Sequence, residues 1–302
     1  MSLLAPTLQA FFTDRLTGQK RASAHTIAAY RDTLRLLLAF AAERTGKTPS
    51  DLDVDDLQAP LIGAFLDHLE HERGNTIRTR NARLAAIRSL FRYAALGHPE
   101  HAATIQRVLA IPSKRTDQAL VTFLTDPELQ ALLEAPDKST WIGRRDHAMI
   151  LLAAQTGLRA SELIGLICGD LRFGIGAHVN TVGKGRKQRI TPLTKQTVTV
   201  TRTWTRERDG QPDDPLFPTS TGRPLTRDAL ERRLAKHAGT AAAACPSLAA
   251  KTVTPHVLRH TAAMRLLHAG VDTTVIALWL GHEQIQTTRL PPRRPGDQAE
   301  GA

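Results

Sequence analysis

The stretch LRFGIGAHVNTVGKGRKQRITPL, residues 171–193, decides the fold class because it breaks the helical pattern that surrounds it. Its β-branched residues flank the sequence GKGRKQ at 183–188, which is typical of two strands joined by a glycine-bearing turn. On either side, apolar residues recur at three- and four-residue steps, which indicates amphipathic helices. This part of the chain therefore predicts a mainly helical α+β domain with a small antiparallel hairpin.

Capping residues and helix breakers set the limits of the helices around the hairpin. A capping box begins at Thr125, Gly157 follows the end of one apolar-periodic run, and Pro255 opens another. A short helix that starts at residue 272 or 273 is predicted to end at Gly281. The other predicted helices span residues 126–134, 144–155, 160–166, 193–208, 227–237 and 255–269.

The first 111 residues predict an all-α domain, with amphipathic helices at 26–44, 55–71 and 76–96. A polar stretch then lies between two apolar-periodic regions, which is typical of a linker. We therefore expect two domains, at residues 1–111 and 123–290, a linker at 112–122, and an irregular, disordered tail at 291–302.

The charge balance favours a polyanionic partner. The 302 residues contain 40 Lys and Arg against 29 Asp and Glu, a formal net charge of +11 with a pI near 10.3. One predicted helix, residues 76–96, has basic residues of one sign on its polar face, with no acidic residue between them. These residues are predicted to contact phosphates, with an ordinary solvated helix face as the alternative: Arg78, Arg80, Arg83, Arg88 and Arg92.

Several other classes of protein are disfavoured by the composition. The two cysteines, Cys168 and Cys245, are far apart and provide neither a disulfide framework nor a zinc-binding spacing. The first sixteen residues have no basic n-region and no apolar run of signal or membrane length. We expect a protein of the reducing cytoplasm that does not enter a membrane.

Several basic residues of the second domain stand at structured positions. Arg159 follows a helix end in TGLR, Lys184 lies in the hairpin turn, and His256 and Arg259 are one helical turn apart. Glu162 has the spacing to brace Arg159. Guanidinium forks match phosphate oxygens, so this set suggests an anion site, although a single such arginine is usually a helix-end charge.

Two histidines add to this set without indicating a metal. His282 follows Leu280 and Gly281 and is a further candidate. His256 and His260 have the i, i+4 spacing of a metal pair, but HVLRH lacks the glutamate of the zincin pattern. We expect neither a metal nor a cofactor.

The chain resembles the tyrosine recombinase, or phage integrase, family. The matching sequences are SAHTIAAYRDTLRLLLAFA at 23–41, TGLRASEL at 156–163, GKGRKQRITPL at 183–193, HVLRHTAA at 256–263 and LGH at 280–282. The resemblance implies a SAM-like, core-binding N-terminal domain and a recombinase catalytic domain that form a C-shaped clamp on double-stranded DNA. It also implies a protein of the nucleoid that assembles into homo-oligomers on DNA.

The resemblance assigns a role to each matched residue. The counterparts of Arg159 and Arg259 hold the scissile phosphate, and that of Lys184 protonates the leaving 5′-oxygen. Those of His256 and His282 assist proton transfer and phosphate binding, and no metal takes part. Fixed guanidinium groups stabilise the charge that builds on the phosphate oxygens.

The sequence departs from the family at the nucleophile. The family's tyrosine lies about nine residues beyond the histidine of LGH, where this chain has Pro291, and its only tyrosines are Tyr30 and Tyr93. A one-base frameshift near codon 289 is one hypothesis for the change, because a back-translation of residues 290–302 encodes a tyrosine in the shifted frame. The missing C-terminal segment is also expected to weaken assembly.

Three functions remain open at this stage. The first is a recombinase that obtains its tyrosine from a corrected frame or from a partner protomer. The second is a DNA-binding relative without catalysis that occupies or blocks recombination sites. An RNA-binding protein is disfavoured because only 4% of the residues are aromatic.

Overall fold

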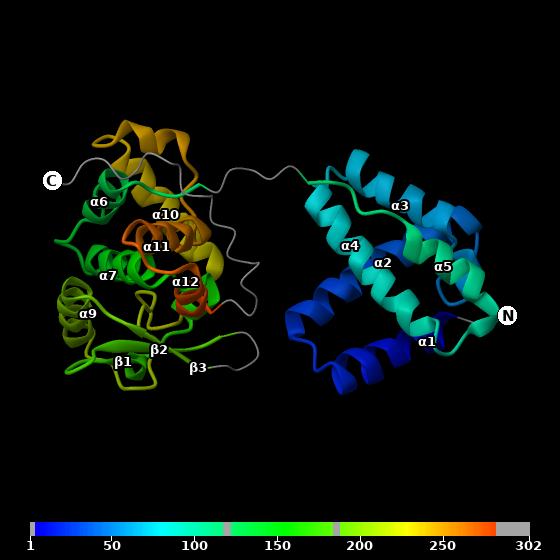
Figure 1. The fold of residues 1–302 in the computed structure, drawn as a ribbon, viewed down its shortest axis with the longest axis horizontal. Coiled ribbons are helices and arrows are strands. Elements are labelled where there is room, and N and C mark those ends of the chain that lie inside the picture. Colours follow the sequence, from blue (N-terminus) through cyan, green and yellow to red (C-terminus); the bar gives the residue numbers. More distant parts are fainter. Residues whose placement is uncertain (1–3, 117–121, 184–187, 282–302) are drawn as a thin grey trace. The chain divides into compact units, whose positions relative to one another are not determined.

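The computed structural model describes residues 4–116, 122–183 and 188–281, and divides the chain into two compact units, Met1–Ala119 and Leu120–Ala302. Each unit has its own cluster of buried apolar side chains. The helices and strands of each unit are labelled in Figure 1. In agreement with the predicted fold class, the first is all-helical and the second combines helices with a small sheet.

The first unit is a bundle of helices around one core. Phe11, Leu37, Phe65 and Leu90 are among its fully buried side chains. Its elements are α1 (Leu4–Ala10), a π-helical segment η1 (Phe11–Gln19), α2 (Ala24–Thr45), a 3-10 turn η2 (Val54–Asp56), α3 (Ala59–His71), α4 (Ile77–Ala94), a 3-10 turn η3 (Pro99–His101) and α5 (Ala102–Ala110).

The predicted helix at 55–71 is in fact two elements. Asp53 caps the turn Val54–Asp56 with a capping box, and α3 begins only at Ala59. Pro60 explains the break, because proline lacks an N–H and fits the first turn of a helix. The predictions at 26–44 and 76–96 are confirmed, with Ser23 and Thr76 as the N-caps of α2 and α4.

The second unit is built around α7, whose residues 148–154 are all buried. Helices α6, α9 and α11 pack against it. The elements are α6 (Asp126–Glu134), α7 (Trp141–Thr156), α8 (Ala160–Ile164), η4 (Cys168–Asp170), β1 (Leu171–Arg172), β2 (His178–Val182), β3 (Gln188–Pro192), α9 (Lys195–Arg208), α10 (Arg227–Ala241), η6 (Pro246–Ala250), α11 (Pro255–His268) and α12 (Thr273–Leu280).

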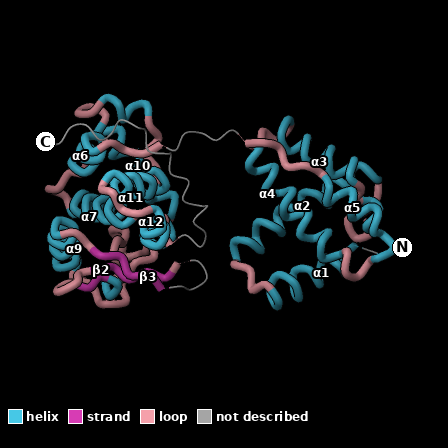
Figure 2. The backbone as a smooth tube through the Cα atoms, viewed as in Figure 1, coloured by secondary structure: helices cyan, strands magenta, loops and turns pink. Residues whose placement is uncertain are grey.

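The predicted hairpin is confirmed and forms part of a three-stranded antiparallel sheet in the order β1-β2-β3, drawn in magenta in Figure 2. Val179 pairs with Thr191 and Thr181 with Arg189, so these four residues share the inward face of the sheet. Val179, Thr181 and Thr191 are buried. The hairpin therefore turns the side chain of Arg189 toward the body of the unit.

Within the described part of the chain, no helix is both long enough and apolar enough to cross a membrane.

Candidate functional site

Arg159 and Glu162 form the centre of the site. Arg159 is the N-cap of α8, and its backbone N–H donates to Glu162 Oε2 at 2.9 Å while its Nη1 donates to Oε1 at 2.7 Å. The side chain of Glu162 is 4% exposed, whereas that of Arg159 is 35% exposed. The predicted bracing of Arg159 by Glu162 is confirmed, and the guanidinium remains accessible to a ligand.

Arg259 enters the same site from α11. Its Nη1 donates to the Gly157 carbonyl at 2.6 Å and its Nη2 to the Leu280 carbonyl at 2.6 Å. Arg159 Nη2 donates to the next carbonyl, that of Gly281, at 2.9 Å. The last carbonyls of a helix have no intrahelical partner and carry partial negative charge, so the two arginines stabilise the end of α12.

Gly157 permits this close approach. Its φ of +65° lies in the left-handed region, and a Cβ there would lie 2.6 Å from a methyl group of Leu280. Any side chain there would force the buried Leu280 side chain of α12 to shift. Glycine both ends α7 and leaves its carbonyl within reach of Arg259.

Arg189 is a site residue that our sequence analysis missed. From β3 it donates through Nη2 to Glu162 Oε2 at 3.1 Å, and its side chain is 12% exposed. Strand alternation was the signal that could have found it, because Arg189 shares the inward face with Thr191. The carboxylate that receives it lies 27 residues earlier, a pairing that no local pattern contains.

Positive charge exceeds negative charge at this site. Among the described residues, the guanidinium groups of Arg159, Arg189 and Arg259 surround the single carboxylate of Glu162. Burial and the neighbouring Arg159 charge lower the pKa of Arg259 to about 10, and Glu162 only partly offsets them. Burial alone would raise the pKa of Glu162, but the Arg159 N–H and the arginine charges outweigh it and lower this pKa. Such an arrangement attracts an anion.

His256 and Arg259 differ in their environments. His256 is exposed at the start of α11, whereas Arg259 is 6% exposed. The Nε2 atoms of His256 and His260 lie 2.8 Å apart. Burial, followed by the charges of His256 and Arg259, lowers the pKa of His260 to about 4. His260 is therefore neutral at pH 7.

A metal site would need more ligands than this pair of histidines provides. Within residues 4–116, 122–183 and 188–281, no three His, Cys, Asp or Glu side chains are placed to hold a metal ion together.

The prediction that α4 exposes a row of arginines is wrong in part. Arg78 and Arg92 are exposed, but Arg80 is buried and its Nε lies 3.6 Å from Glu70 Oε2 on α3. Acidic residues of neighbouring helices supply the charge that α4 itself lacks. Arg83 likewise lies 3.5 Å from Asp32 on α2, and Arg88 donates to the Ile111 carbonyl. The surface open to phosphates is therefore smaller than the sequence predicted.

Three predicted positions lie outside the described residues. They are Lys184 in the hairpin turn, His282 after α12, and Pro291 in the tail.

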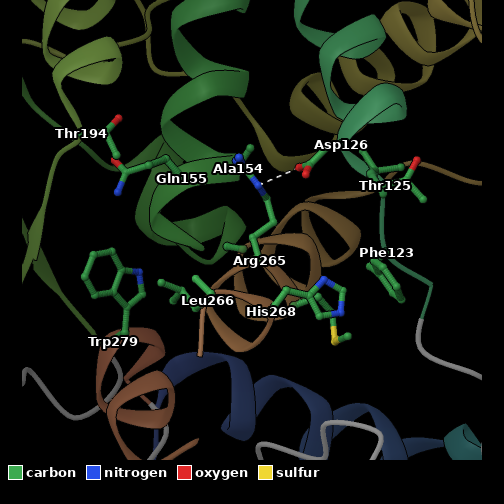
Figure 3. Close-up of a pocket in the computed structure, with 14 residues that line it drawn as sticks. Phe123, Thr125, Asp126, Ala154, Gln155, Thr194, Arg265, Leu266, His268 and Trp279 are labelled. Carbon is green, nitrogen blue, oxygen red and sulfur yellow. Dashed lines mark ion pairs between the residues drawn. The ribbon is translucent and has the colours of Figure 1, made fainter. Parts of the chain in front are cut away.

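A cavity of about 570 Å³ lies between α6, α7, α11 and α12 (Figure 3). Its lining includes Phe123, Leu266 and Trp279, and its arginine, Arg265, is paired with Asp126 at 3.0 Å. Because this charge is neutralised, the cavity does not share the positive excess found around Arg159.

Comparisons with known proteins agree with the motifs. Residues 122–290 match the phage integrase family, and residues 10–97 match the N-terminal SAM-like domain of phage integrases. The chain belongs to the phage integrase family. The resemblance to tyrosine recombinases is confirmed, and so is the SAM-like fold of the first unit.

Curated relatives extend over nearly the whole chain. It is 56% identical to the putative integrase/recombinase y4rC of Sinorhizobium fredii over 287 residues, covering 95% of this chain and 86% of the relative. It is 31% identical to the tyrosine recombinase XerD of Pseudomonas putida, covering 92% and 90%.

Among solved structures, the fold resembles the XerH site-specific recombinase bound to a palindromic difH substrate. The TM-score is 0.71 at 23% identity, and the match covers 89% of this chain and 76% of XerH.

Proposed function

We propose that this integrase-family protein binds duplex DNA and holds a phosphodiester between Arg159 and Arg259. We further propose that it does not cleave the strand, because Pro291 stands where the family's nucleophilic tyrosine is expected. Both units are basic, and we propose that both contact the same duplex. Its place in the cell would then be with the DNA of the nucleoid.

The main support for a phosphate contact is the excess of guanidinium groups over carboxylates at the site. A guanidinium has five N–H donors in a planar fork, and the carbonyls and Glu162 use only some of those of Arg159 and Arg259. Charge-assisted hydrogen bonds to phosphate oxygens would engage the others. A phosphate would also offset the positive charge that Glu162 leaves uncompensated.

The proposed absence of strand cleavage rests on the lack of a nucleophile. A phosphotyrosine link requires a phenolic oxygen, and Pro291 has no nucleophilic atom. No tyrosine follows Tyr93 in the 302-residue sequence, and Tyr93 lies on α4 of the first unit. Such a protein would occupy recombination sites and could block an intact relative from them.

A second candidate function is recombination itself. The chain retains every other motif residue of the family: Arg159, Lys184, His256, Arg259 and His282. Complete retention favours a recent loss or shift of the reading frame. The nucleotide sequence across codons 285–302 distinguishes the two, since a frameshift requires a tyrosine codon in an alternative frame there.

The phosphate contact is tested by the salt dependence of binding to duplex DNA. Each lost phosphate contact lowers the slope of log K against log salt by about 0.9, so we expect Arg159→Ala to reduce it by that amount. Arg227→Ala is the matched control, because Arg227 is an exposed arginine paired with Glu231 on the surface of α10. An unchanged slope for Arg159→Ala would overturn the proposed contact.

A further inference from the structure

We infer that Arg189 is a positioning residue that acts through Glu162 to hold Arg159 in the orientation that binds phosphate. This inference rests on the proposed function, since it assigns a support to the same site. It adds a residue from the sheet to a set that otherwise comes from α8 and α11.

The contacts form a chain of three side chains. Arg189 Nη2 lies 3.1 Å from Glu162 Oε2, and the same oxygen accepts the backbone N–H of Arg159 at 2.9 Å. The other oxygen, Oε1, accepts Arg159 Nη1 at 2.7 Å. With both oxygens engaged, the carboxylate has one favoured rotation, and that rotation sets the Arg159 guanidinium.

Glu162 alone cannot hold this orientation as firmly. Its partners other than Arg189 both belong to Arg159, which is the group to be positioned. Arg189 provides an anchor from a separate element, β3, whose register is fixed by its pairing with β2. Through Arg189 and Glu162, the position of the sheet therefore helps to set the position of Arg159 at the start of α8.

Arg189 itself is fixed on several sides. Its side chain is 12% exposed, and a Cβ at Gly281 would collide with its guanidinium. Its Nε is buried and has no hydrogen-bond partner among the described residues. Its one side-chain hydrogen bond among the described residues goes to Glu162, so this carboxylate fixes the guanidinium of Arg189.

Direct contact with DNA is the rival explanation, and exposure alone does not exclude it, because Arg259, which we propose holds the phosphate, is itself only 6% exposed. Arg159 is 35% exposed at the side chain and can present its fork to a ligand, whereas the guanidinium of Arg189 donates to the buried carboxylate of Glu162. The two explanations differ in what happens when Arg159 is absent. A positioning residue then has nothing to position, but a contact residue keeps its own phosphate.

A double-mutant cycle on duplex DNA separates them. We expect Arg189→Ala to weaken binding roughly tenfold and to lower the salt slope by nearly the 0.9 lost in Arg159→Ala, because both remove one phosphate contact. In the Arg159→Ala background, the same change should weaken binding less than about twofold. Arg189→Lys, which keeps a cationic donor for Glu162, should recover most of the affinity.

Controls keep the result interpretable. Arg172→Ala removes an exposed arginine from β1 of the same sheet and should leave the cycle unchanged. If Arg189→Ala does not fold, as judged by its thermal unfolding, Arg189→Gln takes its place and keeps most of the side-chain volume.

Each outcome decides the inference. Equal losses in both backgrounds would overturn it, because Arg189 would then act on DNA directly or through the stability of the unit. No loss in either background would also overturn it. If Arg159→Ala alone leaves binding and slope unchanged, the proposed phosphate contact is wrong and the positioning role falls with it.

Discussion

At the scale of single residues, the site depends on one buried carboxylate serving several cations. Glu162 lies three residues after Arg159 in the sequence. Their contact could be predicted because residues at i and i+3 share a helix face. The contact of Glu162 with Arg189 was not predictable, because it depends on how the sheet packs against α8. Charge alone misled us at Arg80, whose partner Glu70 lies on another helix.

His260 gives the site a measurable pH response. Its pKa is about 4 in the folded protein and about 6.5 when unfolded, so the unfolded chain takes up a proton first as the pH falls. We therefore expect stability to be complete above pH 6.5 and to decline towards pH 4. The loss between pH 6.5 and 5 should be roughly 1–2 kcal/mol.

Urea unfolding of wild type and His260→Gln at pH 7 and pH 5 checks this. The variant should lose less stability than wild type on acidification. His268→Gln, at an exposed position of α11, is the control and should follow wild type. An equal pH effect in wild type and His260→Gln would show that another group titrates.

At the scale of elements, capping residues were the most informative signals for where helices begin. Thr125, Thr226 and Pro255 mark the starts of helices as expected, because capping and proline preferences are local. The helix α5 was not delimited, although Ile105, Val108 and Leu109 recur at three- and four-residue steps, because no capping side chain marks its start. The strand β1 has only two residues, too few to show strand alternation. The packing of α12 against the α7–α8 turn likewise had no sequence signal.

Gly157 tests that packing. Gly157→Ala combines a strained left-handed backbone with a collision against Leu280, so we expect it to destabilise the second unit by more than about 2 kcal/mol. Gly270→Ala is the matched control, because Gly270 has a φ of +79° and nothing within 4 Å of its Cβ position. It should cost about 1 kcal/mol.

Chemical denaturation of both variants provides the measurement. A Gly157→Ala variant no less stable than Gly270→Ala would contradict the close approach of α12.

At the scale of the whole molecule, composition and family agree on the class of ligand. The net charge of +11 favoured a polyanionic partner. Membership of the phage integrase family places the chain among DNA-recombination proteins. The bundle and the mixed unit were both expected from periodicity. The position of Pro291 drew attention only through the family motif, because no physical rule places a tyrosine beyond LGH.

Duplex DNA should be preferred over single strands of the same length and sequence. The basis is that phosphate spacing in a duplex presents more charge per unit length to a basic surface. Binding titrations at matched salt compare the two forms. Equal or tighter binding to single-stranded DNA or RNA would favour the RNA-binding alternative.

Covalent capture is the most direct test of a DNA-binding integrase relative without a nucleophile. The chain is incubated with a random-sequence duplex library and denatured in detergent, and protein-linked DNA is recovered; an intact tyrosine recombinase is the positive control. We predict reversible binding before denaturation and no DNA attached afterwards. DNA covalently bound to this chain would contradict the claim, because Pro291 could not have formed the bond.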